Sequence, residues 1–121
     1  MHIDIADKLS LHFQPIVLLS SMISCPLLKA IRKAKENSDR VIVCFHGGNE
    51  FNPLPSPDTQ DRYRLICDMG ADAVIAGHTH CPQGYEFYDG KPIVYSMGNL
   101  LFKSSVEKAP DDAWHYGYLC L

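Results

Sequence analysis

Two apolar segments of this chain each end in a glycine-containing turn that carries histidine. Residues 41–45 (Val-Ile-Val-Cys-Phe) run into His46, and residues 73–76 (Ala-Val-Ile-Ala) run into the Gly-His-Thr-His sequence of residues 77–80. Short apolar runs of this kind are typical of strands buried in a parallel sheet. Glycine allows the backbone to turn sharply where such a strand ends. The pattern therefore predicts two parallel strands, each followed by a turn that carries histidine.

The spacing of these strands predicts that their histidines converge. The segment between them, roughly 25 residues long, has the length of a helical crossover between parallel strands. Such crossovers place both carboxyl ends at one edge of the sheet, where ligands gather, with neighbouring backbones about 4.8 Å apart. We therefore expect His46, His78 and His80 to meet at one point. Neutral imidazoles suit a first-row divalent metal, here Mn, Fe or Zn.

Two helices are predicted around the first strand. Residues 26–37 begin with proline and repeat apolar side chains at helical spacing, with basic residues on the other side. A second helix is expected from residue 57 to about residue 69, with Ser56 as its N-cap and Gly70 as its stop. The side chains expected to be buried on it are Tyr63, Leu65, Ile66 and Met69.

The other segments give signals of different clarity. Residues 84–95 predict a β-hairpin, because Asp89-Gly90 separates two runs of aromatic and β-branched residues. A short strand over 100–102, a polar loop over 103–112 and strand character over 114–121 complete the chain. Residues 1–24 remain unassigned, although the apolar run of residues 16–19 suits either one buried strand or a remnant of something larger.

Composition limits the classes of function. The 121 residues carry a formal net charge of −3, which gives no basic surface for nucleic acid. The longest apolar stretch, residues 16–28, is too short for a membrane segment. Five cysteines without a Cys-x-x-Cys pair favour a reducing compartment, so we expect a cytoplasmic location for the chain as written.

Several blocks of the sequence resemble one family. The blocks are residues 45–50 (Phe-His-Gly-Gly-Asn-Glu), 70–80, 89–93 (Asp-Gly-Lys-Pro-Ile) and 95–102 (Tyr-Ser-Met-Gly-Asn-Leu-Leu-Phe). In order and spacing they resemble the poly-γ-glutamate capsule biosynthesis (CapA-type) proteins of the calcineurin-like metallophosphoesterase superfamily. The resemblance covers roughly residues 27–102. It departs at Gly47, where the family usually carries a larger residue.

The resemblance implies a fold and a site. The fold would be an α/β chain, part of a calcineurin-like metallophosphoesterase sandwich, with a βαβ unit followed by a β-hairpin and further strands. Residues 25–121 would be the C-terminal part of the domain. His46 and His78 would bind one metal and His80 a second. The implied function is metal-dependent phosphoester hydrolysis in the complete domain, with a phosphoester or capsule-precursor substrate and a role in poly-γ-glutamate synthesis or export.

Three sequence blocks of the superfamily have no counterpart here. These are the Asp-x-His, Gly-Asp and Gly-Asn-His blocks, which supply the bridging carboxylate, a further ligand and the histidine that assists the leaving group. Two metals close together need a bridging carboxylate to offset their repulsion and to orient the attacking hydroxide. We therefore identify no catalytic residue in this chain and expect little or no phosphoesterase activity from it alone.

Two further residues each have two alternative interpretations. Glu50 either orients an imidazole N–H as a carboxylate behind the metal ligands or is a solvated loop charge. Asn99 either supports the site in the same way or serves the backbone of its turn. Cys81 adds a weaker alternative, a structural zinc site with His78 and His80.

The missing sequence blocks also predict that this chain pairs with another chain. A partial domain leaves a sheet edge and an apolar face exposed, which predicts a homo-oligomer or a complementing N-terminal half. The alternative function is therefore a non-catalytic metal-binding or structural subunit that pairs with a partner chain. The cell envelope is the alternative location if the full-length protein carries an anchor.

Overall fold

The computed structural model describes residues 13–18, 25–100 and 115–119, the first range by its backbone. Its centre is one mixed sheet of five strands in the order β1-β2-β3-β5-β4. The strands are β1 (Phe13–Leu18), β2 (Arg40–His46), β3 (Ala73–Gly77), β4 (Tyr85–Tyr88) and β5 (Lys91–Val94). Neighbouring strands pair in parallel except β4, which is antiparallel to β5 at one edge. The predicted α/β class, a βαβ unit followed by a hairpin, is confirmed.

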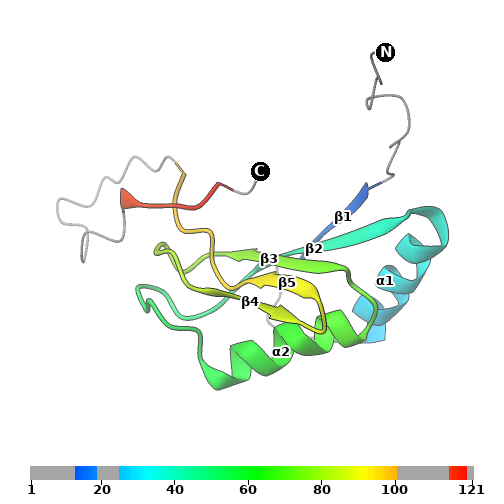
Figure 1. The fold of residues 1–121 in the computed structure, drawn as a ribbon, viewed down its shortest axis with the longest axis horizontal. Coiled ribbons are helices and arrows are strands. Elements are labelled where there is room, and N and C mark those ends of the chain that lie inside the picture. The colour runs from blue at the N-terminus through cyan, green and yellow to red at the C-terminus, as the bar shows by residue number, and fades with distance from the viewer. Residues whose placement is uncertain (1–12, 19–24, 101–114, 120–121) are drawn as a thin grey trace, which may run out of the picture.

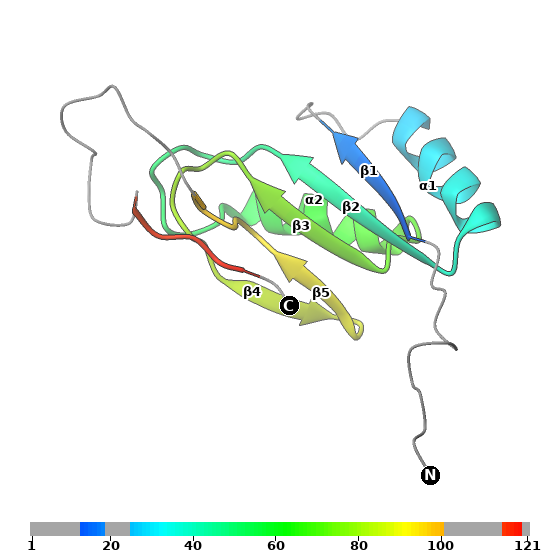
Figure 2. The same ribbon diagram turned by 90° about the horizontal axis from the view of Figure 1, so that it is seen from above.

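The two helices lie on the same face of the sheet (Figure 1). Helix α1 (Cys25–Asn37) connects β1 to β2, and helix α2 (Pro57–Asp68) connects β2 to β3. The strand order moves in one direction from β1 to β3. Successive right-handed crossovers in one direction return on the same side, which explains the shared face. The view from above shows the carboxyl ends of β2 and β3 at one edge (Figure 2).

The hydrophobic core fills the space between this sheet face and the helices. Side chains of β2 alternate between buried and less buried positions, as expected of a strand with one face against a helix layer. The buried core residues of the helices are Leu27 and Ile31 on α1 and Tyr63, Ile66 and Cys67 on α2. The expectation for Leu65 was wrong, because this side chain is 44% exposed. Consecutive helix residues are turned by about 100°, and Ile66 takes the inward direction.

Local signals placed most element ends correctly. The Thr59 N–H donates to Ser56 Oγ at 3.2 Å, so Ser56 is the N-cap of α2. Gly70, with a φ of 116°, ends that helix. Asp89 and Gly90 have φ values of 49° and 72° in the hairpin turn, which matches the positive values that a two-residue turn requires.

The C-terminal predictions are only partly covered. The polar loop over 103–112 and most of the strand over 100–102 lie outside the described residues. Of the predicted strand over 114–121, the described residues 115–119 make a single β-bridge, between Gly98 and Gly117, and no regular strand. This segment lies over the sheet face opposite the helices, where Tyr118 lines a groove with Tyr85, Phe87, Pro92 and Val94.

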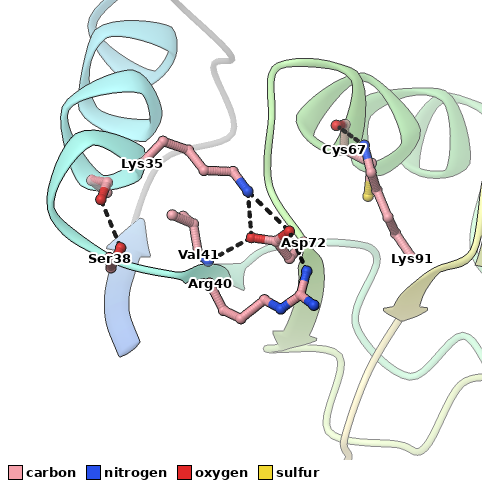
Figure 3. A network of polar contacts seen from close by, with 8 residues as sticks. Lys35, Ser38, Arg40, Val41, Cys67, Asp72 and Lys91 are labelled. Carbon is pink, nitrogen blue, oxygen red and sulfur yellow. Dashed lines mark hydrogen bonds and ion pairs between the residues drawn. The ribbon is translucent and has the colours of Figure 1, made fainter. Parts of the chain in front are cut away.

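A cluster of polar contacts joins α1, β2 and β3 at the amino edge of the sheet (Figure 3). The Asp72 carboxylate accepts hydrogen bonds from Lys35 Nζ at 2.7 and 2.9 Å. Arg40 Nη1 lies 3.4 Å from the same carboxylate. Nearby, Lys91 Nζ donates to the Cys67 carbonyl at 2.7 Å, which satisfies a carbonyl in the last turn of α2. Charged side chains thus stabilise the amino edge of the sheet, whereas the histidine turns lie at its carboxyl edge.

Two further observations concern the predicted class. Among the described residues, no helix has the length and apolar character that crossing a bilayer requires. The four cysteines of the described part are free thiols, with Cys67 and Cys81 buried and Cys25 exposed.

Candidate functional site

The loops after β2 and β3 are joined by backbone hydrogen bonds. The strand register pairs His46 with Gly77, the last residues of the two strands. The Gly47 N–H then donates to the Gly77 carbonyl at 3.1 Å, and the Phe51 N–H donates to the Thr79 carbonyl at 2.8 Å. The parallel pairing therefore continues into the loops and brings the two histidine turns together.

His46 and His78 are in direct contact. His46 Nε2 lies 3.1 Å from His78 Nδ1, and the ring centroids are 4.7 Å apart. One of the two rings donates its N–H to the other, and the tautomers of the rings decide which one is the donor. The centroid of His80 lies 6.4 Å from that of His78. The structure thus brings ring nitrogens of His46 and His78 into contact and places the His80 ring beside His78.

The backbone of the second turn is held in an unusual conformation. His78 has a φ of 110° and His80 a φ of 57°, both in the region that favours glycine. Such backbone persists only where the surrounding structure fixes it, and it is frequent at functional sites. Thr79, between the histidines, is fully buried and provides the fixing contact.

Thr79 anchors the turn through its hydroxyl. Thr79 Oγ1 donates to the Cys81 carbonyl at 2.8 Å and lies 2.8 Å from Ser96 Oγ. Because Thr79 points into the protein, the flanking His78 and His80 imidazoles remain half-buried rather than buried. His46, on the other turn, is exposed. Glycine at position 48 permits the close approach, since a Cβ there would lie 2.9 Å from Thr79 Cγ2.

Glu50 and Asn99 each lie beside one imidazole. Glu50 Oε1 is 3.7 Å from His78 Nε2, which is longer than a hydrogen bond. His80 Nδ1 and Asn99 Oδ1 are 2.9 Å apart, and Asn99 Nδ2 donates to the His80 carbonyl at 3.3 Å. Asn99 is thus placed to orient the His80 ring, whereas Glu50 lies near His78 without a hydrogen bond to it. For both residues a role behind metal ligands stays a prediction.

The structure does not support the alternative zinc site with Cys81. The Cys81 thiol is buried and donates to the Asn52 carbonyl at 3.2 Å, so it is turned toward the loop after β2. Within residues 25–100 and 115–119, no three His, Cys, Asp or Glu side chains stand in the arrangement of a metal site. The pair His46 and His78 is the part of the predicted cluster whose nitrogen atoms already meet.

Three contributors to the site were missed by sequence reasoning. Phe51 stacks on His80, with ring centroids 6.1 Å apart and an interplanar angle of 23°. Gln83 Nε2 donates to the Asn52 carbonyl at 2.8 Å and helps to hold the first loop. Ser96 supports Thr79 as described above. No local pattern marks these contacts, because each joins residues far apart in the chain.

The fold and the site define an α/β chain with a histidine cluster at the carboxyl edge of a parallel sheet. A family model described as "Bacterial capsule synthesis protein PGA_cap" matches residues 19–104. The match covers more than half of the chain, so the chain belongs to this family of bacterial capsule synthesis proteins. The resemblance seen in the sequence blocks is thereby confirmed.

Individual relatives support the same assignment. The chain is 36% identical over 91 residues to the capsule biosynthesis protein CapA of Bacillus anthracis, a match that covers 72% of this chain and 22% of the relative. It is 34% identical over 83 residues to the PGA biosynthesis protein CapA of Bacillus subtilis, which covers 69% of this chain and 22% of the relative. A probable polyglutamine synthesis accessory protein of Mycobacterium tuberculosis is 37% identical over 68 residues, or 55% of this chain and 18% of the relative. The matches thus span about a fifth of the length of these relatives.

Proposed function

We propose that this chain carries the histidine-bearing part of a metal-dependent phosphoesterase domain that serves in poly-γ-glutamate or capsule biosynthesis. Membership in the capsule synthesis family and the names of the CapA relatives support the biological role. The proposed metal ligands are His46, His78 and His80. The observation that carries the chemical part is the 3.1 Å separation of His46 Nε2 and His78 Nδ1.

This separation fits a shared metal ion. Zinc–imidazole bonds are about 2.0–2.1 Å long, so two nitrogens on one ion lie about 2.9–3.4 Å apart for bond angles between square and tetrahedral. The pair at 3.1 Å lies inside this range. Mn²⁺ and Fe²⁺ also accept imidazole ligands, so the donor set leaves the choice among the three metals open.

Each residue of the site has a defined task in this proposal. His46, His78 and His80 would hold a divalent ion, which would supply an activated water and neutralise phosphoryl charge. Glu50, whose Oε1 lies 3.7 Å from His78 Nε2, would be the carboxylate that orients the His78 imidazole. The exposed ring of Phe51 covers one face of His80 and limits how that ring can turn.

The proposal assigns little or no turnover to this chain by itself. Hydrolysis by a two-metal site requires a bridging carboxylate, and the described part of the chain brings no Asp or Glu into a three-ligand group with the histidines. We propose that a complementing N-terminal half, as part of the same protein or as a partner chain, provides these groups. We propose the cytoplasm as the location, with the cell envelope as the alternative if the full-length protein carries an anchor.

Metal binding tests the proposal directly. Calorimetric titration of the 121-residue chain with Zn²⁺ and Mn²⁺ should show binding that falls at least tenfold in His46→Ala and in His78→Ala. The matched control is His115→Ala, whose side chain is exposed and lies on the C-terminal segment. Equal affinities in all four proteins would overturn the assignment of ligands.

Turnover of an aryl phosphate ester tests the second part. We expect metal-loaded wild-type protein to show no rate above a His46→Ala, His80→Ala double variant. A wild-type rate well above that baseline would show that the missing sequence blocks are dispensable.

A second candidate function is a non-catalytic subunit that pairs with another chain. The observation that favours it is an apolar groove of about 330 Å³ on the sheet face opposite the helices. Tyr85 and Phe87, which line it, are 71% and 68% exposed. In light scattering after size exclusion, a wild-type dimer that dissociates in Phe87→Ser but not in Leu65→Ser would support pairing through this groove. A monomeric wild-type chain would contradict self-pairing and leave the complementing half as the partner to test.

A further inference from the structure

The C-terminal segment crosses the turn that follows β5. The Asn99 N–H donates to the Tyr116 carbonyl at 3.2 Å, and the Tyr118 N–H donates to the Met97 carbonyl at 2.8 Å. These bonds flank the bridge between Gly98 and Gly117. Figure 2 shows the two segments meeting beyond the end of β5. The turn of residues 97–99 is thus held from outside by residues 116–118.

Only glycine fits at the crossing. A Cβ on Gly117 would lie 2.4 Å from the Asn99 carbonyl oxygen, and a Cβ on Gly98 would lie 2.5 Å from the Tyr116 carbonyl oxygen. Both obstacles are backbone atoms, which cannot turn aside as a flexible side chain does. Gly98 also has a φ of 71°, which other residues rarely adopt. The two backbones therefore approach as closely as they do because both residues lack a side chain.

The crossing fixes Asn99, and Asn99 contacts His80 at two points. Asn99 Nδ2 donates to the His80 carbonyl, an atom that can only accept, at 3.3 Å. The amide orientation is thereby determined, and Asn99 Oδ1 is the atom that faces His80 Nδ1 at 2.9 Å. An amide oxygen only accepts, so His80 Nδ1 must carry the proton. In the neutral ring, the lone pair then lies on Nε2.

We propose that Asn99 is a positioning residue that holds His80 in its Nδ1–H tautomer, and that the Gly98–Gly117 crossing keeps Asn99 in place for this task. The ring then presents Nε2 as its ligand atom. The value of this arrangement to a metal site rests on the proposed function. The inference about the tautomer itself rests on the two hydrogen bonds between Asn99 and His80.

The tautomer is measurable without metal. Two-bond proton–nitrogen correlation spectra of the 15N-labelled chain, at a pH about 1.5 units above the ordinary histidine pKa of about 6.5, distinguish the two neutral forms. The His80 signals are assigned by their loss in His80→Gln. We expect the wild-type chain to show the Nδ1–H pattern for His80. An Nε2–H pattern in the wild-type chain would overturn the inference, whatever the variants do.

Variants test the roles of Asn99 and of the crossing. Asn99→Asp keeps an acceptor and should retain the Nδ1–H form, whereas Asn99→Leu should lose it. Gly117→Ala should shift His80 in the same direction as Asn99→Leu, and Gly84→Ala, where a Cβ meets nothing within 4 Å, is the matched control. An unchanged His80 pattern in folded Asn99→Leu would refute the positioning role.

Metal affinity separates this inference from the proposed function. If the chain binds Zn²⁺, Asn99→Leu should weaken binding by about 10–100-fold and Asn99→Asp should restore most of it. If the wild-type chain binds no Zn²⁺, the proposed ligand role fails, and the spectra alone decide on the tautomer. If Zn²⁺ binds equally well to Asn99→Leu, the positioning role is contradicted while the metal site stands.

Discussion

Asp72 and Val41 are joined by two hydrogen bonds at the amino edge of the sheet. Asp72 Oδ2 accepts a hydrogen bond from the Val41 N–H at 2.7 Å, and the Asp72 N–H donates to the Val41 carbonyl at 2.8 Å. With Lys35 and Arg40 on the same carboxylate, this one side chain ties α1 to the starts of β2 and β3. Both strands end in the histidine turns, so the contact sets their register far from the site.

Removal of this carboxylate should destabilise the fold. Asp72→Ala leaves the Val41 N–H and the Lys35 ammonium without their acceptor, and we expect a loss of about 1–3 kcal/mol in the free energy of unfolding. Urea denaturation followed by circular dichroism measures it. The matched control, Asp61→Ala, removes a carboxylate that is 81% exposed and should change stability little. Equal losses in the two variants would contradict the role assigned to Asp72.

The same carboxylate predicts how stability changes with pH. Burial of Asp72, the largest single effect, raises its pKa, but hydrogen bonds from Lys35 and the Val41 N–H together outweigh it and hold the pKa below the ordinary value of 3.8. A carboxyl group with a lowered pKa in the folded state stabilises the protein above its unfolded pKa and loses this contribution as the pH falls through its folded pKa. Between about pH 5 and about pH 3, Asp72→Asn should therefore lose less stability than the wild-type protein. A steeper acid dependence in the variant would contradict the assignment.

A bidentate ion pair connects α2 to the edge strand. Arg64 Nε and Nη2 each lie 2.8 Å from Glu86, whose Oε1 also accepts from Tyr95 OH at 2.6 Å. Lysine cannot reproduce the two parallel bonds, so Arg64→Lys should lower the melting temperature measured by calorimetry. The control on the same helix is Arg62→Lys, where the wild-type arginine makes a surface pair with Asp58 at 2.9 Å. Similar shifts in both variants would show that the pair contributes no more than a surface contact.

A methyl group at position 48 should disturb the site as well as the fold. Gly48 has a φ of 118°, and an added Cβ would lie 2.9 Å from Thr79 Cγ2. Gly48→Ala should therefore cost more than about 1 kcal/mol in the free energy of unfolding. Because it pushes the two histidine loops apart, any metal affinity should fall with it. Gly84→Ala is the control in both measurements, and parallel results for the two variants would contradict the close packing of these loops.

The sequence was informative where the signal was local. The apolar runs before His46 and Gly77, the cap at Ser56 and the Asp89-Gly90 turn each act through a few neighbouring residues, and the structure contains all of them. The meeting of the two histidine turns followed from one topological rule, that a helical crossover joins parallel strands whose carboxyl ends share an edge. These features therefore needed no knowledge of side-chain packing.

The remaining features depend on contacts across the chain. The partners Thr79 and Ser96 are separated by 17 residues and His80 and Asn99 by 19, and nothing in either sequence neighbourhood specifies the other. Leu65 is exposed because packing of the whole core sets the rotation of α2 about its own axis. The apolar pattern of the helix alone does not determine that rotation. The bridge at Gly117 likewise depends on where the C-terminal segment returns. Tertiary packing determines these contacts and exposures.

The inward direction of Thr79 has a consequence for mutational scanning of this turn. Because the Thr79 hydroxyl is buried between the His78 and His80 turn positions, we expect Thr79 to tolerate replacement poorly. Valine at this position keeps the shape but leaves Ser96 Oγ and the Cys81 carbonyl without their shared partner. Intolerance across residues 78–80 would therefore combine two origins, the proposed metal binding by His78 and His80 and the buried hydrogen bonds of Thr79.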